Sequence, residues 1–221
     1  MKRTWVIVPA SLGLLGLAGL IALHLWLGSL IKAGVERIGP MVTKTPVSVE
    51  TVAISLVSGC ATVKGLVVGN PSGYRAPHAL SVGSTKVCVA PASVFGNPLI
   101  VTAVTVEQPA VTLEGLFGDS NLSRIQSNAQ TFAGTGAADK RAKTETTGGE
   151  RRILIKEFRF TKGRVTMVLK TGLLGDRNME MGLPEVHLRD IGRETNGAKP
   201  DELSSAISKA VFTAIKRAVA G

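Results

Sequence analysis

The sequence predicts a mainly β protein with flanking helices, in which an N-terminal transmembrane helix is followed by an antiparallel β-sheet and a C-terminal amphipathic helix. Three patterns lead to this fold class. An uncharged apolar run opens the chain, apolar and polar residues alternate through its middle, and apolar residues recur at helical spacing near its end. We therefore expect one globular domain behind a membrane anchor.

The apolar run extends from Trp5 to Ile31, and no Lys, Arg, Asp or Glu occurs between Arg3 and Lys32. Roughly 20 apolar residues span the hydrocarbon core of a bilayer, so this run is long enough to cross it. A cleaved signal peptide has an apolar core of only about 7 to 15 residues, followed by a small-residue cleavage site that this sequence lacks. We expect a retained anchor and a helical stalk over residues 1–40, ending at a Gly-Pro break.

The residues that flank the run give the anchor a direction. Trp5 and Trp26 lie near its two ends, where indole rings are found at membrane interfaces. Lys2 and Arg3 precede it, and positively charged flanks stay in the cytoplasm. This predicts a single-pass protein whose N-terminus is cytoplasmic, although two basic residues just beyond the run oppose that orientation.

Alternation of apolar and polar residues predicts strands after the stalk. Val47 and Val49 precede Val52, Ile54 and Leu56, and the change of phase between Val49 and Val52 indicates a bulge. Further strands are expected over residues 60–68, 79–89, 99–106, 110–114, 152–160, 164–170 and 179–188. Turn-forming residues separate them, which predicts a meander of antiparallel strands.

Two helices are expected after the first strands. Leu122 and Ile125 belong to a brief helix with Asp119 or Ser120 as its N-cap. The final helix of the chain begins near Leu203 and has an apolar stripe on one side.

These patterns divide the chain beyond the stalk into three segments. Residues 41–132 form a β-rich segment with the short helix, and residues 150–221 form a second β segment and the C-terminal helix of the same domain. Between them, residues 133–149 are mostly Gly, Thr, Ala and charged, without apolar periodicity. Such a composition predicts a flexible linker.

Cys60 and Cys88 are the only cysteines of the chain. If Val68 pairs with Leu80 across the loop between them, an antiparallel register places Cys60 opposite Cys88. Cross-strand neighbours can meet disulfide geometry, and an oxidising compartment would allow the bond. The alternative is two small buried thiols that are free and inert, and the sequence leaves both open.

No pattern in the sequence predicts catalysis. His24, His78 and His187 are far apart and lack metal-ligand spacing, and no nucleophile or phosphate-binding motif occurs. Aromatic residues make up only 4%, which favours strands packed through β-branched side chains over an aromatic catalytic cavity. We expect no catalytic residue, no cofactor and no metal. The net charge of +10 would attract phosphates, but the predicted topology places the domain outside the cytoplasm, so no nucleic-acid partner is expected.

Several segments, taken in order, resemble the AsmA-like family of bacterial envelope proteins. After the anchor and the strand at 47–56, they are GLVVGNPSGY at 65–74, the strand at 100–106 with Glu-Gln-Pro at 107–109, NLSRIQ at 121–126 and LPEVHLRDIG at 183–192. The resemblance covers nearly the whole chain. The chain departs from the family at Lys199-Pro200, where the family usually has Thr-Pro at the start of its last helix.

The resemblance implies an inner-membrane protein whose sheet is curved and lies in the periplasm. It also implies phospholipid handling or outer-membrane biogenesis as the function, with membrane lipids as partners and phospholipid in an apolar groove. Val52, Ile54 and Leu56 lie on one face of the predicted strand and are the candidate groove residues. The alternative is that this stripe packs against the final helix as ordinary core.

The size of the predicted sheet limits this function. About seven or eight strands spaced about 4.8 Å apart give a groove only about 35 to 40 Å long, which is too short to cross a periplasm. Lipid transport would then require other envelope proteins or self-assembly by strand addition. The alternative function is a structural or scaffolding subunit that tethers a partner complex at the membrane.

Overall fold

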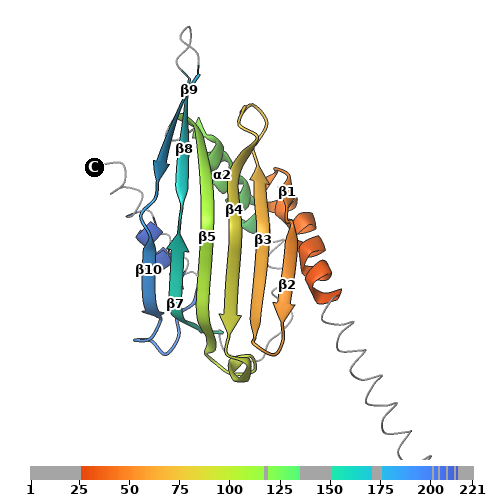
Figure 1. Cartoon of the computed structure of the whole chain (residues 1–221), viewed down its shortest axis with the longest axis vertical. Coiled ribbons are helices and arrows are strands. Elements are labelled where there is room, and N and C mark those ends of the chain that lie inside the picture. Colours follow the sequence, from red (N-terminus) through yellow and green to blue (C-terminus); the bar gives the residue numbers. More distant parts are fainter. Residues whose placement is uncertain are drawn as a thin grey trace, which may run out of the picture.

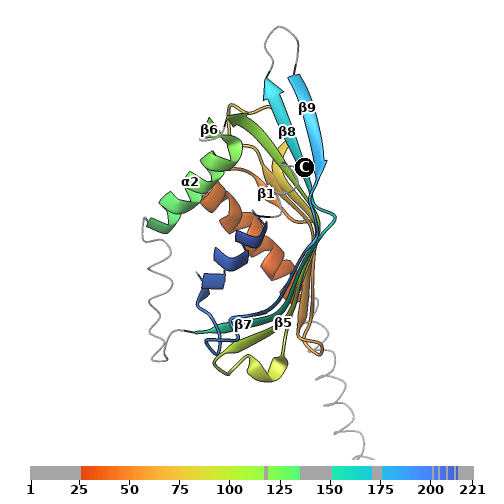
Figure 2. The ribbon, with the colours of Figure 1, turned by 90° about the vertical axis from the view of Figure 1, so that its left-hand side faces the viewer.

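The computed structural model describes residues 26–116, 119–134, 151–170 and 176–200, together with residues 202, 203, 205–207, 209–211 and 213. A curved sheet dominates this part of the chain, and helices lie against its concave face (Figure 2). The mainly β class is therefore confirmed. The predicted apolar run from Trp5 to Ile31 lies outside the described residues except for residues 26–31. Within the described residues, no helix has both the length and the apolar character needed to cross a membrane.

The sheet contains ten described strands (Figure 1). In chain order they are β1 (Val47–Ser48), β2 (Thr51–Ser55), β3 (Cys60–Gly69), β4 (His78–Val89), β5 (Leu99–Leu116), β6 (Asp119–Ser120), β7 (Ile153–Thr161), β8 (Arg164–Lys170), β9 (Asp176–Gly182) and β10 (Val186–Ile191). Their order in space is β1-β3-β4-β5-β7-β10, with β2 beside β3, β6 and β8 beside β5, and β9 beside β8. The long axis of the molecule follows the strands.

The helical elements connect or flank these strands. A short 3-10 helix, η1 (Pro91–Ser93), lies in the connection from β4 to β5, and α2 (Asn121–Gly134) follows β6. Residues 26–43 form a helix before β1, called here the N-terminal helix. The described helical residues between 200 and 213 are called the C-terminal helix.

The sheet is mixed, which corrects the prediction of an antiparallel sheet. β3, β4 and β5 form the expected meander, but β7 and β8 both pair with β5 in parallel. Parallel strands require a crossover of a dozen or more residues. The connection from β5 to β7, which includes α2, is long enough for this crossover, and β7 begins at the end of the sheet where β5 began. Alternation along a strand carries no information about the direction of its neighbour, and for this reason the sequence pattern missed the crossover.

Several predicted boundaries are also wrong. The N-terminal helix passes through Gly39-Pro40 and ends where Lys44, with a φ of 57°, donates its N–H to the Pro40 carbonyl at 3.0 Å. Pro40 lies in the last turn, where its missing N–H removes only one helical hydrogen bond. α2 continues to Gly134, past the predicted start of the linker at 133, and residues 135–150 lie outside the described part.

The strands predicted at 99–106 and 110–114 form the single strand β5, whereas the strand predicted at 179–188 is divided into β9 and β10. β7 and β8 likewise lie end to end along β5. These differences have one cause. Neighbouring strands are irregular at positions that lie side by side across the sheet, and we call these positions one level of the sheet.

At this level Gly65 of β3 lies opposite Gly83 of β4, because Lys64 and Leu66 pair with the two residues beside Gly83. Gly83 in turn lies opposite Gln108 of β5, because the residues beside Gly83 pair with the two residues beside Gln108. Gly65 and Gln108 have φ angles of 61° and 52°. The alternation of side chains shifts here, so Val106 and Val111 contact the same core although they are an odd number of positions apart. The change of phase that the sequence predicted between β1 and β2 occurs at this same level, because the Glu50 N–H donates to the Gly65 carbonyl.

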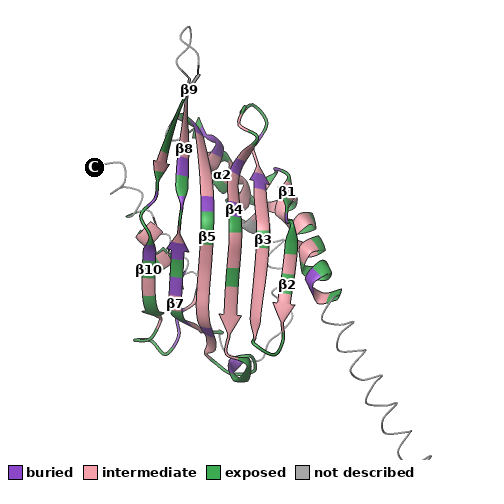
Figure 3. Ribbon diagram, viewed as in Figure 1, coloured by how far each residue is buried: buried purple, intermediate pink, exposed green. Residues whose placement is uncertain are grey.

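The core lies between the concave face and the C-terminal helix. Its buried residues are Val101, Ile155, Phe158, Phe160, Val165, Leu183, Val186, Ala198 and Leu203. In β7 the exposed Arg159 separates the buried Phe158 and Phe160, so both rings lie on one face, and buried and exposed positions are both seen along this strand (Figure 3). The C-terminal helix begins with an N-cap interaction, because the Glu202 carboxylate accepts the Lys199 N–H at 3.0 Å. Glu202 thus caps the start of this helix at Lys199.

Candidate functional site: an apolar pocket beside the N-terminal helix

The N-terminal helix packs closely against the edge of the sheet formed by β1 and β2. A Cβ atom on Gly28 would overlap the Val52 carbonyl, and one on Gly39 would lie 2.7 Å from the Val47 Cβ. Two glycines therefore permit this approach.

The other described helix with a predicted cap is α2. Ser120 caps it by accepting the Ser123 N–H at 3.2 Å, which confirms one of the two predicted N-caps.

Polar side chains of the N-terminal helix also engage the backbone of this edge. Glu36 Oε1 accepts the Val49 N–H at 3.0 Å, and Lys32 Nζ donates to the Glu50 carbonyl at 3.0 Å. Free N–H and C=O groups on an edge strand are otherwise available to a further strand. The helix thus closes this edge where the strands β1 and β2 meet.

A pocket of about 430 Å³ lies beside the first turns of this helix. Ligand pockets of roughly 300 to 1,000 Å³ with mainly apolar linings are typical of proteins. Its walls come from the N-terminal helix, the β2–β3 turn with its strands, and the connection from β4 to β5. The lining residues are Leu27, Ile31, Ile54, Ser55, Leu56, Gly59, Cys60, Ala61, Val87, Val89, Pro91, Val94 and Phe95. None of these side chains is charged, so the pocket suits an apolar ligand.

Two of the three candidate groove residues line the pocket. They are Ile54 and Leu56, and Leu56 lies beyond the end of β2 with 50% of its surface exposed. Val52 is half-buried beneath the N-terminal helix. The predicted alternation is correct for Val52 and Ile54. The alternative prediction named the wrong helix, because Leu27 and Ile31 of the N-terminal helix face Ile54 across the pocket.

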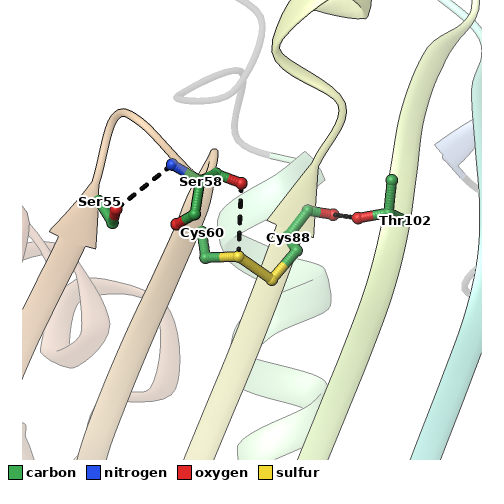
Figure 4. The surroundings of a disulfide bond; sticks show 5 residues. All are labelled: Ser55, Ser58, Cys60, Cys88 and Thr102. Atoms are coloured by element: carbon green, nitrogen blue, oxygen red, sulfur yellow. Dashed lines mark hydrogen bonds between the residues drawn. A yellow bond between two sulfur atoms is a disulfide. The ribbon is translucent and has the colours of Figure 1, made fainter.

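A disulfide joins two strands at the wall of the pocket (Figure 4). The predicted register is confirmed, because Val68 pairs with Leu80 and Cys60 pairs with Cys88. The two cysteine Cα atoms are 4.0 Å apart, and the structure records the bond rather than two free thiols. Because the Val89 N–H donates to the Gly59 carbonyl at 2.9 Å, the cysteines occupy a non-hydrogen-bonded pair, where opposed strands come closest.

The predicted anchor flanks are only partly described. Lys2, Arg3 and Trp5 lie outside the described residues, as does His24. Trp26 is the first described residue and is 68% exposed. It lies at the start of the N-terminal helix, one residue before the pocket lining begins.

Two exposed apolar residues near the pocket were not identified from the sequence. Val57, in the β2–β3 turn, is 96% exposed, and Phe95, after η1, is 100% exposed. The signal was present, since each is a large apolar residue within a segment of turn-forming residues. The turn-forming neighbours of these two residues predict only a turn, not an exposed apolar surface.

A buried polar cluster lies toward the opposite end of the sheet, and the sequence pattern also missed it. The Glu114 carboxylate accepts the N–H groups of Arg75 and Ala76 at 2.8 and 3.0 Å, and Asn121 Oδ1 accepts the Glu114 N–H at 3.0 Å. Glu114 and Asn121 are fully buried. The cluster holds the loop after β3 against α2, which is a structural role.

An exposed ion cluster on the other face of the sheet has no catalytic arrangement. Glu157 Oε1 lies 2.7 Å from a guanidinium nitrogen of Arg159 and 2.9 Å from Nε2 of His187. The hydrogen bond from Arg159 is the largest cause that lowers the pKa of Glu157. No group of three His, Cys, Asp or Glu that could hold a metal occurs among the described residues.

Comparison with protein families and with curated sequences identifies no relative. No protein-family model matches the chain, and no curated protein sequence matches it. Its function is therefore inferred from its residues and from the geometry of the pocket.

Proposed function

We propose that this protein is a single-pass inner-membrane protein that resembles AsmA-like proteins and takes part in phospholipid handling or envelope biogenesis. In this proposal the N-terminus is cytoplasmic and the bulk of the chain is periplasmic. One observation carries it: Leu27 and Ile31, at the end of the apolar run from Trp5 to Ile31, form part of the pocket wall. The predicted membrane segment therefore leads directly into an apolar cavity.

The chemistry of the lining supports an acyl chain as the ligand. Burial of an acyl chain contributes about 0.8 kcal/mol for each CH₂ removed from water, and no charged side chain opposes it here. A phosphate headgroup finds no cation in the lining and would remain outside. The proposed ligand is thus the tail of a membrane lipid, with its headgroup at the pocket mouth.

The disulfide between Cys60 and Cys88 supports the proposed location. Disulfides persist in oxidising compartments such as the bacterial periplasm and are rare in the cytosol. A periplasmic domain also places its pocket beside the outer leaflet of the inner membrane, where a phospholipid tail is available.

Two matched substitutions test the lipid proposal. Ala61→Phe places a ring in the pocket, whereas Ala53→Phe adds the same ring at an exposed position of the neighbouring strand. After gentle detergent purification of the full chain, we expect phospholipid to co-purify with the wild type and the Ala53→Phe protein but to be depleted from the Ala61→Phe protein. Equal lipid content in all three, or none in the wild type, contradicts the proposal.

The alternative proposal is a scaffolding subunit that tethers a partner complex. It is favoured by the closed concave face, since helices cover much of the surface that a long groove would need. Among the described strands, β9 and β10 form the edge opposite β1 and β2, which is the edge that the N-terminal helix engages. Self-assembly or a partner strand would add beside β9 and β10. Stoichiometric recovery of a partner complex without bound lipid would favour this function over the first.

A further inference from the structure

The loops nearest the pocket and the first described residue of the N-terminal helix carry a set of apolar side chains that the core does not use. We name this set the apolar rim, and it consists of Trp26, Leu56, Val57, Val94 and Phe95. We propose that the apolar rim docks on the surface of the bilayer, with Val57 and Phe95 entering the region between headgroups and acyl chains. This inference rests on the anchored topology of the proposed function and adds a second membrane contact to the anchor.

The exposure of the rim is the first reason for the proposal. Phe95 is 100% exposed and Val57 is 96% exposed, so neither side chain is covered by the fold. Single exposed apolar residues are common on proteins, but a contiguous set marks an interaction surface. The set is contiguous here, because Leu56, Val94 and Phe95 line one pocket although they come from two different loops.

The position of the rim is the second reason. The β2–β3 turn and the connection from β4 to β5 lie at the same end of the sheet (Figure 1), and the disulfide between Cys60 and Cys88 ties them together. The N-terminal helix begins at this end, with Trp26 exposed. From Trp26 the sequence continues back through the apolar run to Trp5. A chain anchored by that run holds the rim next to the membrane.

The charge of the rim is the third reason. Residues 55–60 and 90–98, which form its two loops, contain no Asp, Glu, Lys or Arg, so no charge within these loops opposes their insertion. The exposed Arg151 donates to the Val94 carbonyl, which places a guanidinium group beside the rim. An apolar surface with a cation beside it suits the membrane interface, where headgroup phosphates lie next to the acyl chains. A negatively charged lipid phosphate therefore finds a cation next to the inserted side chains.

Docking of the rim fixes the orientation of the whole domain. Side chains of interfacial elements lie about 5 to 10 Å into the boundary between headgroups and acyl chains. With Val57 and Phe95 at that depth, the strands extend away from the membrane and the mouth of the pocket lies at headgroup level. A lipid tail then enters the pocket without crossing water.

Fluorescence in full-length protein reconstituted into phosphatidylglycerol and phosphatidylethanolamine vesicles tests this. Phe95→Trp reports on the rim, and Met179→Trp is the matched control, because Met179 is 52% exposed on β9 at the far end of the sheet. Lipids brominated on the acyl chain quench only indoles that reach them. The wild type, with Trp5 and Trp26 as its only tryptophans, gives the baseline to subtract.

We expect the added emission of Phe95→Trp to be blue-shifted and mostly lost on bromination, while that of Met179→Trp is unchanged. If the wild-type tryptophans are quenched but the added indole at position 95 stays water-exposed, the rim proposal is wrong and the anchor stands. If the wild-type tryptophans are not quenched either, the anchored topology itself fails. A blue shift at position 95 that is independent of bromination but rises with protein-to-lipid ratio would mean that a second copy covers the rim, which also overturns the proposal.

Discussion

Asn121 donates a hydrogen bond of 2.8 Å from Nδ2 to Oδ1 of Asn70, although the two residues are far apart in the chain. Nδ2 of Asn121 also donates to the Thr112 carbonyl at 2.7 Å, while its Oδ1 accepts the Glu114 N–H. One buried amide therefore connects α2, β5 and the loop after β3. This contact joins the Gly-Asn-Pro turn at residues 69–71 to the Asn-Leu start of α2.

Asn121→Ala should lower the free energy of unfolding by several kcal/mol, because each buried polar group left without a partner costs about 1 to 3 kcal/mol. Chemical denaturation of the protein in detergent, followed by far-ultraviolet circular dichroism, measures the change. Ser127→Ala, at an exposed position of the same helix, is the control and should change stability little. Equal stability of both variants would mean that the cluster around Asn121 contributes nothing.

The sequence predicted those elements whose signals are local. The pairing of Cys60 with Cys88 followed from one turn and a constant register, and the phase change before Val52 marked a real irregularity in the sheet. The parallel pairing of β7 with β5 depends on where the crossover delivers the chain, and no local pattern records that. Glu114 was missed for a related reason, since its backbone partners come from a distant loop.

The candidate site was predicted only in part, because it combines segments that are separate in sequence. Ile54 was identified from strand alternation, whereas the contribution of Leu27 required the N-terminal helix to fold back on β2. That packing depends on Gly28 of the N-terminal helix, which lies against the Val52 carbonyl of β2. Periodicity describes which face of an element is apolar but does not identify the element that covers it.

Reduction of the disulfide should destabilise the domain. The cysteines are 28 positions apart, and closing a loop of this length contributes about 3 to 4 kcal/mol in the chain-entropy description. We expect a lower midpoint of thermal unfolding in dithiothreitol than in its absence. A protein with Cys60→Ala and Cys88→Ala should unfold at the lower temperature with or without dithiothreitol. A reductant effect of equal size on that double variant would show that the disulfide is not its cause.

The ion cluster around Glu157 predicts a dependence of stability on pH. The neighbouring Arg159 lowers the pKa of Glu157 in the folded protein, so the ionised carboxylate favours folding. Its contribution is present above the unfolded glutamate pKa of about 4.3 and is lost as the pH falls through the lower pKa of the folded state. Glu157→Gln should therefore be less stable than the wild type near neutral pH, and the two should converge in acid.

Thermal unfolding of both proteins across this pH range measures the difference, which we expect to be small because the carboxylate is exposed and water screens the pair. Added salt should reduce it further. A difference that stays constant down to acidic pH would assign the effect to packing rather than to the charge of Glu157.

Gly28 and Gly34 provide a matched pair of substitutions within the N-terminal helix. A Cβ on Gly28 would overlap the Val52 carbonyl, whereas nothing lies within 4 Å of a Cβ on Gly34. Gly28→Ala should push the helix off β2 and destabilise its docking by about 1 to 3 kcal/mol, the usual cost of overpacking. Gly34→Ala should instead stabilise the helix by up to about 1 kcal/mol, because Ala is the better helix former.

Hydrogen exchange measures this docking directly at one backbone group. The Val49 N–H donates to Glu36 of the helix, so it should exchange faster in Gly28→Ala and at an equal or slower rate in Gly34→Ala. Because the pocket wall includes Leu27, co-purified lipid should fall in the first variant only. Faster exchange at Val49 in both variants would show that the helix responds to any added methyl group, and that its contact with the Val52 carbonyl does not control the position of the pocket wall.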